Sequence, residues 1–280
     1  MINEIALNDW YPVAMASELK PGCRLNRVLM EREIQISNDG DKTHAFEGSR
    51  VLPLQIRYDH VWTSLGAPAR PLFEIPEGEQ DGRRLVACGR VHVRCSPLRA
   101  VENFLDIAHF PYVHTGILGA EDHPEVERYD VEIDDEKDEV WARQVKFFQP
   151  QAAKSAEGGI MADYMYRVPA PTTSILYKTC PARVGEWDII TLFVQPVSET
   201  TCDVWPWMAL YDDETPFNDL VQFQQTIFMQ DRSILENQIP ALLPLDPKME
   251  TPTRADLTSI AYRRWLKRRR MFYGAQTIAA

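Results

Sequence analysis

Short segments of alternating apolar and polar residues recur up to about residue 200 of this chain, and this pattern restricts the possible folds most strongly. A period of two is typical of β-strands, whereas the longer segments near residue 100 and after residue 215 have the period of an α-helix. We expect strands at residues 24–37, 51–65, 85–94, 129–133, 140–148, 164–168, 174–179, 188–197 and 202–211, and helices at about 98–110, 216–239 and 254–271. A hairpin turn is predicted at residues 38–41. The pattern therefore predicts an α+β fold, in which long helices pack against a mostly antiparallel sheet.

The composition allows a large folded unit and excludes some partners. Of the 280 residues 45% are hydrophobic, which is enough for a sizeable core. The net charge is −11, so we expect no nucleic-acid binding. The first residues lack a secretory signal and no apolar run reaches membrane-spanning length, so we expect a cytoplasmic protein without membrane contact. The 5 cysteines, at positions 23, 88, 95, 180 and 202, have no paired spacing and fit free thiols.

The run from Asn103 to His114 concentrates groups that can bind a metal. It has the pattern N-x-x-D-x-x-H-x-x-x-x-H. Two histidines and a distant carboxylate form the facial triad of non-haem iron(II) oxygenases. In a helix over 98–110, Asp106 and His109 share a face, and a break at Pro111 lets His114 turn back toward His109. The alternative is two histidines at the edge of the core.

The predicted helix at 216–239 contains a candidate for the third ligand. Asp231 lies in the apolar stripe that includes Ile227 and Phe228. An ionised carboxylate in that position is costly unless it is paired or bound to a metal. The alternative is a buried aspartate paired with an arginine or a backbone amide. Gln224 lies on the same face, where it is either a substrate contact or a paired core amide.

Together these residues resemble the oxygenase α subunits of Rieske non-haem iron oxygenases, in the branch of vanillate and dicamba O-demethylases and purine N-demethylases. The resemblance covers nearly the whole chain and is carried by residues 8–14, 61–66, 103–114, 228–238 and 261–266. It implies a helix-grip-like catalytic domain. It also implies that His109, His114 and Asp231 bind a mononuclear Fe(2+), that Asp106 passes electrons to the iron, and that Asn103 supports the site.

The chain departs from this family at the Rieske [2Fe-2S] cluster. The family binds the cluster through Cys-x-His and Cys-x-x-His, and neither pattern occurs here. Where the family continues into the first of them, this chain reads Thr43 to Arg50 and goes on to the strand at Val51. We therefore expect no [2Fe-2S] cluster in this chain. Residues 1–66 are predicted to be a truncated Rieske-like β remnant and residues 67–280 the catalytic domain, with a linker at 66–82.

This truncated form resembles methylxanthine N-demethylase subunits that lack a Rieske centre. The resemblance implies an O2-dependent monooxygenase that hydroxylates an N-methyl group of a methylxanthine-like heterocycle and releases formaldehyde. A separate Rieske-containing reductase is then expected to dock near Asp106 and supply electrons. It also implies a trimer or a hetero-oligomer. Two alternatives stay open: an O-demethylase or hydroxylase of an aromatic acid, and a non-catalytic ligand-binding or structural subunit.

A run of basic residues lies near the C-terminus of this acidic chain. It consists of Arg263, Arg264, Lys267, Arg268, Arg269 and Arg270. Cations are favoured near the C-terminus of a helix, so a solvated helix face is one interpretation. The other is a docking surface for an acidic redox partner.

Overall fold

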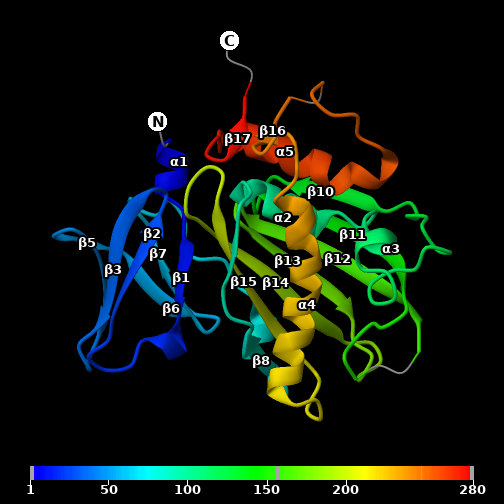
Figure 1. The fold of residues 1–280 in the computed structure, drawn as a ribbon, viewed down its shortest axis with the longest axis horizontal. Helices are drawn as coiled ribbons and strands as arrows, with labels where there is room; N and C mark the ends of the chain where they lie inside the picture. The colour runs from blue at the N-terminus through cyan, green and yellow to red at the C-terminus, as the bar shows by residue number, and fades with distance from the viewer. Residues whose placement is uncertain (1–2, 156–157, 247, 278–280) are drawn as a thin grey trace.

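Two regions make up the molecule, a small β region at the N-terminus and a larger region of sheet and helices (Figure 1). The computed structural model describes residues 3–155, 158–246 and 248–277. All pairings within its larger sheets are antiparallel, and the helices pack against the largest sheet. The predicted α+β class is therefore confirmed.

The N-terminal region contains two small sheets, with strand orders β2-β3-β4-β5 and β1-β7-β6. Its elements are α1 (Glu4–Leu7), β1 (Tyr11–Met15), η1 (Ala16–Glu18), β2 (Arg24–Leu29), β3 (Arg32–Asn38), β4 (Thr43–Glu47), β5 (Arg50–Leu52), β6 (Leu54–Arg57) and β7 (His60–Thr63). The predicted hairpin turn is confirmed, since Asn38 pairs with Thr43. Strand β4 was not predicted, because only Ala45 in its middle is buried and the segment lacks a clear alternation.

The larger region is organised around an eight-stranded sheet of order β10-β11-β12-β13-β14-β15-β8, in which β9 also pairs with β15. Its strands are β8 (Arg84–Ala87), β9 (Val91–Val93), β10 (Asp130–Asp134), β11 (Glu139–Gln149), β12 (Ile160–Ala170), β13 (Thr173–Thr179), β14 (Trp187–Pro196) and β15 (Cys202–Leu210). A parallel pair, β16 (Leu243–Pro244) and β17 (Ala275–Gln276), lies near the C-terminus.

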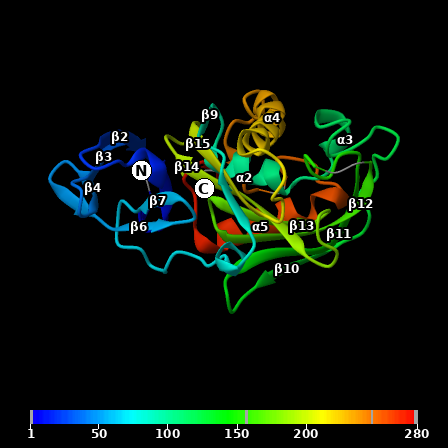
Figure 2. The same cartoon turned by 90° about the horizontal axis from the view of Figure 1, so that it is seen from below.

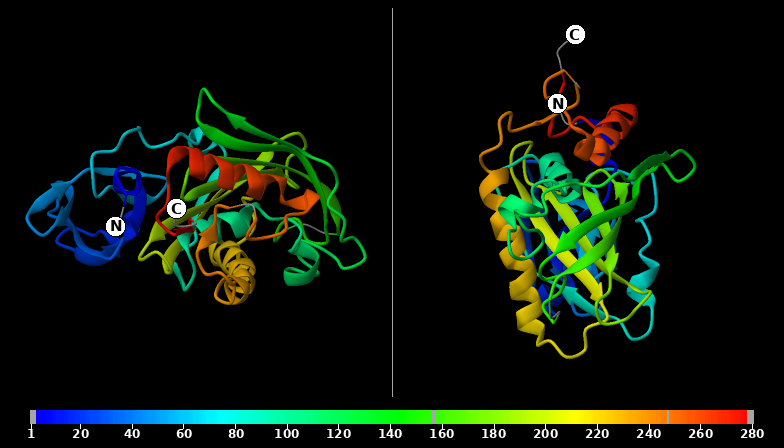
Figure 3. Two further views of the ribbon diagram at one scale, coloured as in Figure 1. Left: turned by 90° about the horizontal axis from the view of Figure 1, so that it is seen from above. Right: turned by 90° about the vertical axis from the view of Figure 1, so that its right-hand side faces the viewer.

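Helices lie on both faces and at one end of this sheet (Figures 2 and 3). They are η2 (Pro76–Glu79), α2 (Pro97–Leu105), α3 (Phe110–Val113), α4 (Phe217–Leu235), η3 (Arg254–Asp256) and α5 (Leu257–Arg269). Helix α2 packs on β13 and β14, α4 contacts α2 and β8, and α5 contacts β10, β11 and α2. Among the described helices, none is both long and apolar enough to cross a membrane.

An aromatic cluster joins the two regions. Tyr58 and Trp62 of the N-terminal region pack against Phe193 of β14, and Tyr58 also meets Trp207 of β15 edge-on. The Trp207 indole N–H donates to Asp59 at 2.9 Å. His60 is fully buried among these rings, and burial lowers its pKa to about 4.

The predicted linker at 66–82 packs onto this aromatic cluster. Leu72 and Ile75 are buried, and the Tyr58 hydroxyl donates to the carbonyl of Phe73 and accepts from the amide of Ile75. The segment is outside regular structure except for η2, yet it is held by these contacts. The domain division at residue 66 stays a prediction.

Candidate metal centre

The helix predicted over 98–110 is divided into two. Helix α2 ends at Leu105, and Asp106 follows it with an extended backbone. Helix α3 begins at Phe110 and has Pro111 in its first turn, where a proline is well accommodated. The expected break at Pro111 was therefore wrong: the chain leaves the helix at Asp106, and Pro111 helps to start the next one. The shared helix face of Asp106 and His109 was wrong for the same reason.

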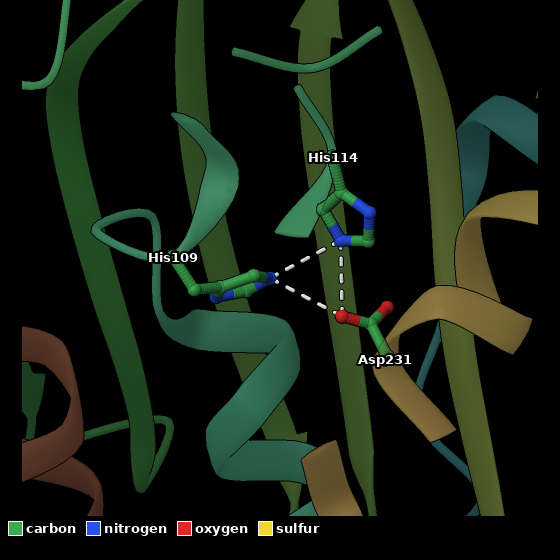
Figure 4. Close-up of side chains that lie close together, drawn as sticks. All are labelled: His109, His114 and Asp231. Atoms are coloured by element: carbon green, nitrogen blue, oxygen red, sulfur yellow. Dashed lines mark hydrogen bonds and ion pairs between the residues drawn. The ribbon is translucent and has the colours of Figure 1, made fainter. Parts of the chain in front are cut away.

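His109, His114 and Asp231 nevertheless converge on one point (Figure 4). The histidines flank α3, and Asp231 reaches them from the buried face of α4. His109 Nε2 lies 3.2 Å from Asp231 Oδ1, and His114 Nε2 lies 3.0 Å from the same oxygen. The two Nε2 atoms are 3.2 Å apart. Two imidazoles and one carboxylate thus present ligand atoms to a common centre, and we call these three residues the His/Asp centre.

The outer nitrogens of both histidines are held by neighbouring side chains. His109 Nδ1 lies 3.0 Å from Asp106 Oδ2, and His114 Nδ1 lies 2.8 Å from Gln230 Oε1. With protons on both Nδ1 atoms, the two Nε2 lone pairs face Asp231. Metal-binding histidines are commonly oriented in this way through their second nitrogen. Gln230 was not predicted, because adjacent positions on a helix point about 100° apart and Asp231 occupies the buried stripe.

The charges around the centre favour a bound cation. Burial works to lower the pKa of His109, but contacts with the Asp106 and Asp231 carboxylates raise it to about 9. Burial works to raise the pKa of Asp231, but the two histidines lower it to about 2. Asp231 Oδ1 is buried and accepts no hydrogen bond from the described residues. A proton or a metal ion can provide the positive charge, and a set of two nitrogens and one carboxylate suits a divalent transition metal.

Two cavities share Asn103 of α2 in their lining. The inner cavity, of about 90 Å³, borders the centre and is lined largely by apolar and aromatic side chains, including Phe110, Tyr164, Tyr166, Leu176 and Ile227. The outer cavity, of about 510 Å³, is lined by Asp106 and by charged residues of α2, α5 and the segment before α5. Asn103 lines both cavities. Gln224 is buried and lines the inner cavity but not the outer one.

The basic run near the C-terminus is divided between two roles. Arg263 forms ion pairs with Glu102 and Glu250, each at 2.5 Å, and Arg269 pairs with Asp138 at 3.0 Å. Arg268 also pairs with Asp138 and with Asp135. Arg264 and Lys267 instead border the outer cavity and form no ion pair with the described residues. Part of the run therefore fixes α5, and part of it is exposed beside Asp106.

Comparisons with known proteins identify the family of this chain. Residues 93–270 match the family model of the vanillate O-demethylase oxygenase C-terminal domain. A probable methylxanthine N7-demethylase, NdmC, of Pseudomonas sp. (strain TJI-51) is 41% identical over 274 residues, which cover 97% of each chain. The methylxanthine N3-demethylase NdmB of Pseudomonas putida is 26% identical over 230 residues, 76% of this chain and 58% of that protein.

Two solved structures show the same fold. NdmA of Pseudomonas putida CBB5 aligns with a TM-score of 0.72 and 18% identity, over 94% of this chain and 90% of NdmA. Dicamba monooxygenase bound to 3,6-dichlorosalicylic acid aligns with a TM-score of 0.73 and 16% identity, over 97% of this chain and 99% of that one. At these identities the likeness establishes the fold.

Proposed function

This chain belongs to the vanillate O-demethylase oxygenase C-terminal domain family of Rieske-type non-haem iron oxygenases, and on that premise we propose that it is an oxidative N-demethylase of methylxanthines. The convergence of His109, His114 and Asp231 beside the inner cavity is the observation that carries the proposal. These three residues would hold Fe(2+). When bound there, iron supplies the activation of dioxygen that the reaction requires.

The reaction balance defines what the protein must provide. An N-methyl group, O2, two electrons and two protons give an N-hydroxymethyl group and water, and the N-hydroxymethyl group then releases formaldehyde. The apolar inner cavity would exclude bulk water and hold the ring beside the His/Asp centre. Asp106 would keep His109 oriented and face the side from which electrons arrive. Asn103, which lines both cavities, would support the wall between them.

The lining of the inner cavity favours a neutral heterocycle over an aromatic acid. Among the described residues that line it, none is an arginine, which would be the natural partner of a benzoate carboxylate. Lys178 is buried in the lining, but its ammonium donates to the carbonyl of Ala152 and its strand partner is Asp188. The relative with 41% identity is described as a methylxanthine demethylase, which also supports this substrate class. O-demethylation of an aromatic acid remains the second candidate.

We further propose that electrons come from a separate Rieske-containing reductase that docks over the outer cavity. Asp106 lines this cavity and exposes 28% of its side chain, while Arg264 and Lys267 at the rim would attract an acidic partner. An internal [2Fe-2S] cluster is not expected. This expectation rests on the sequence, in which neither Cys-x-His nor Cys-x-x-His occurs. A trimer or a hetero-oligomer is the assembly that we propose for this chain.

Anaerobic reconstitution with Fe(2+) followed by a substrate screen tests this function. The iron-loaded chain, NADH and a Rieske-containing reductase are supplied with methylxanthines or methoxybenzoates, and formaldehyde is measured. We expect formaldehyde from methylxanthines. Formaldehyde from methoxybenzoates alone would favour the second candidate. A chain that binds no iron and releases no formaldehyde from either class would instead be a ligand-binding or structural subunit.

A further inference from the structure

The inner cavity contains a polar side chain that the His/Asp centre does not use. Gln149 is the last residue of β11, and its side chain lines the cavity although its exposed fraction is 0%. Neither its Oε1 nor its Nε2 pairs with any described residue. Leaving both halves of a buried amide unpaired is costly, and buried polar groups normally have partners. Gln149 therefore has two unsatisfied hydrogen-bonding positions, buried in the wall of the space that would hold substrate.

Strand β11 connects this amide to a residue that packs close to the His/Asp centre. Val145, Phe147 and Gln149 alternate on the buried face of the strand. The ring of Phe147 packs edge-on against Phe110 with centroids 5.7 Å apart, and Phe110 directly follows His109. Two residues along a strand span about 7 Å. Gln149 thus lies about one heterocycle's width beyond the residue that packs beside the centre.

The other buried polar groups of the cavity divide into used and unused ones. Lys178 donates to Ala152, and Asp188 accepts from the backbone amide of Tyr211 at 3.2 Å. In contrast, the Tyr166 hydroxyl, like the Gln149 amide, is buried without a partner among the described residues. Outside the His/Asp centre, the buried charged groups are therefore occupied and the buried open positions are uncharged, whereas the charged Lys154 of the lining is exposed. This matches a ring that carries carbonyl and N–H groups but no charge.

A carboxamide offers an acceptor beside two donors, so it can form two hydrogen bonds with a ring edge where a carbonyl adjoins an N–H. Xanthine rings have such an edge wherever the nitrogen beside a carbonyl carries no methyl group. The carboxylate of an aromatic acid has only acceptors, so one of its oxygens would be repelled by the Gln149 Oε1 acceptor. Building on the proposed function, we propose that Gln149 binds the unmethylated carbonyl–N–H edge of the xanthine and so directs the opposite methyl group toward His109, His114 and Asp231.

A comparison of two ligands and one substitution tests this role. 7-Methylxanthine keeps both ring N–H groups of its six-membered ring, whereas 1,3,7-trimethylxanthine has none. Calorimetry on the iron-loaded, anaerobic protein without reductase measures binding in the absence of turnover. We expect Gln149→Met to raise the dissociation constant of 7-methylxanthine about 10- to 100-fold, since two hydrogen bonds are lost, and that of the trimethyl compound by less than about threefold.

Thermal unfolding separates a ligand-binding role from a structural one. Gln149→Met removes an unpaired buried amide, so the midpoint temperature of thermal unfolding of the ligand-free protein should stay the same or rise. Gln222→Met makes the same chemical change on the exposed face of α4 and should change neither binding nor stability. Gln149→Glu keeps the shape of the side chain but loses the amide donor, so it should also weaken binding of 7-methylxanthine. It replaces Gln149→Met in the test if the methionine variant does not fold.

Three results would overturn the inference. Equal losses of affinity for both ligands would show that Gln149 shapes the cavity without binding the edge. A ligand-free midpoint lowered in both Gln149 variants, with unchanged affinity, would make the amide structural. If the wild-type protein binds no methylxanthine at all, the proposed function fails together with the inference, whereas the first two results leave that function standing.

Discussion

The inner and outer cavities differ in chemistry. The inner one is small and largely apolar, and outside the His/Asp centre its buried unpaired polar groups, the Gln149 amide and the Tyr166 hydroxyl, are uncharged. The outer one is larger and lined by Glu102, Asp106, Arg263 and other charged residues. A dry apolar pocket suits a small ring, whereas an exposed charged rim suits a transient protein partner. The proposed function assigns the substrate to the inner cavity and the redox partner to the outer one, so substitutions in the two cavities should have separable effects.

The largest effect is expected at the His/Asp centre itself. Asp231→Ala removes one of the three ligand atoms, so bound iron should fall from about one per chain to less than about a tenth, and formaldehyde release should be lost. Metal analysis after anaerobic reconstitution measures this. Asp213→Ala, which removes an exposed carboxylate before α4, is the control and should retain iron. Unchanged iron in Asp231→Ala would place the metal elsewhere.

Asp106→Ala should lower turnover and leave substrate binding nearly unchanged. Because Asp106 contacts His109 Nδ1 and lines the outer cavity, its loss should lower the turnover number about 10- to 100-fold. The dissociation constant of 7-methylxanthine should stay within about twofold, and most of the iron should be retained. Asp106→Asn keeps an acceptor for His109 and should recover part of the activity. A parallel loss of substrate affinity in both variants would contradict the division between the two cavities.

Acid should destabilise the protein through a residue that belongs to neither cavity. Burial lowers the pKa of His60 to about 4, below the ordinary value of 6.5. As the pH falls, His60 therefore binds a proton in the unfolded chain before it does so in the folded protein. The contribution of neutral, buried His60 to the free energy of unfolding is complete above about pH 6.5 and is lost as the pH falls toward 4. Between pH 7.5 and 5.0 the free energy of unfolding should fall by about 2 kcal/mol. Urea unfolding measures it, and the same pH difference in His60→Phe would exclude His60 as the cause.

Charge reversal at the rim of the outer cavity should have the smallest effect. Arg264→Glu combined with Lys267→Glu removes two exposed cations beside Asp106. We expect the second-order rate of reduction by the Rieske-containing reductase to fall about tenfold at low ionic strength, with a weaker dependence on salt. Lys20→Glu with Lys42→Glu makes the same charge change on the N-terminal region. Equal effects of the two double variants would rule out local docking.

Much of the His/Asp centre could be predicted from local pattern. The helical period of α4 places Asp231 on a buried face, and the short spacing of His109 and His114 limits their separation. The position of the helix break at Asp106 could not be predicted. The sequence alone does not show whether Pro111 ends one helix or lies in the first turn of the next one. Gln230 and Gln149 were missed for a different reason: each becomes informative only through contacts, or their absence, with residues far along the chain.

The fold shows the same division between local and distant information. The long strands of the main sheet have clear alternation and were predicted, whereas β4 has a single buried residue and was not. The packing of residues 66–82 onto Tyr58 was also outside sequence reasoning, since glycine and proline in that segment indicate only the absence of regular structure.

The stoichiometry of the reaction tests the central claim most directly. Iron-loaded wild-type protein is incubated with 7-methylxanthine, limiting NADH and the reductase, and formaldehyde, xanthine and oxidised NADH are counted. We expect one formaldehyde and one xanthine for each NADH oxidised, and none when the iron is omitted. NADH oxidation without formaldehyde, or formaldehyde formed equally by Asp231→Ala, would contradict an N-demethylase centred on His109, His114 and Asp231.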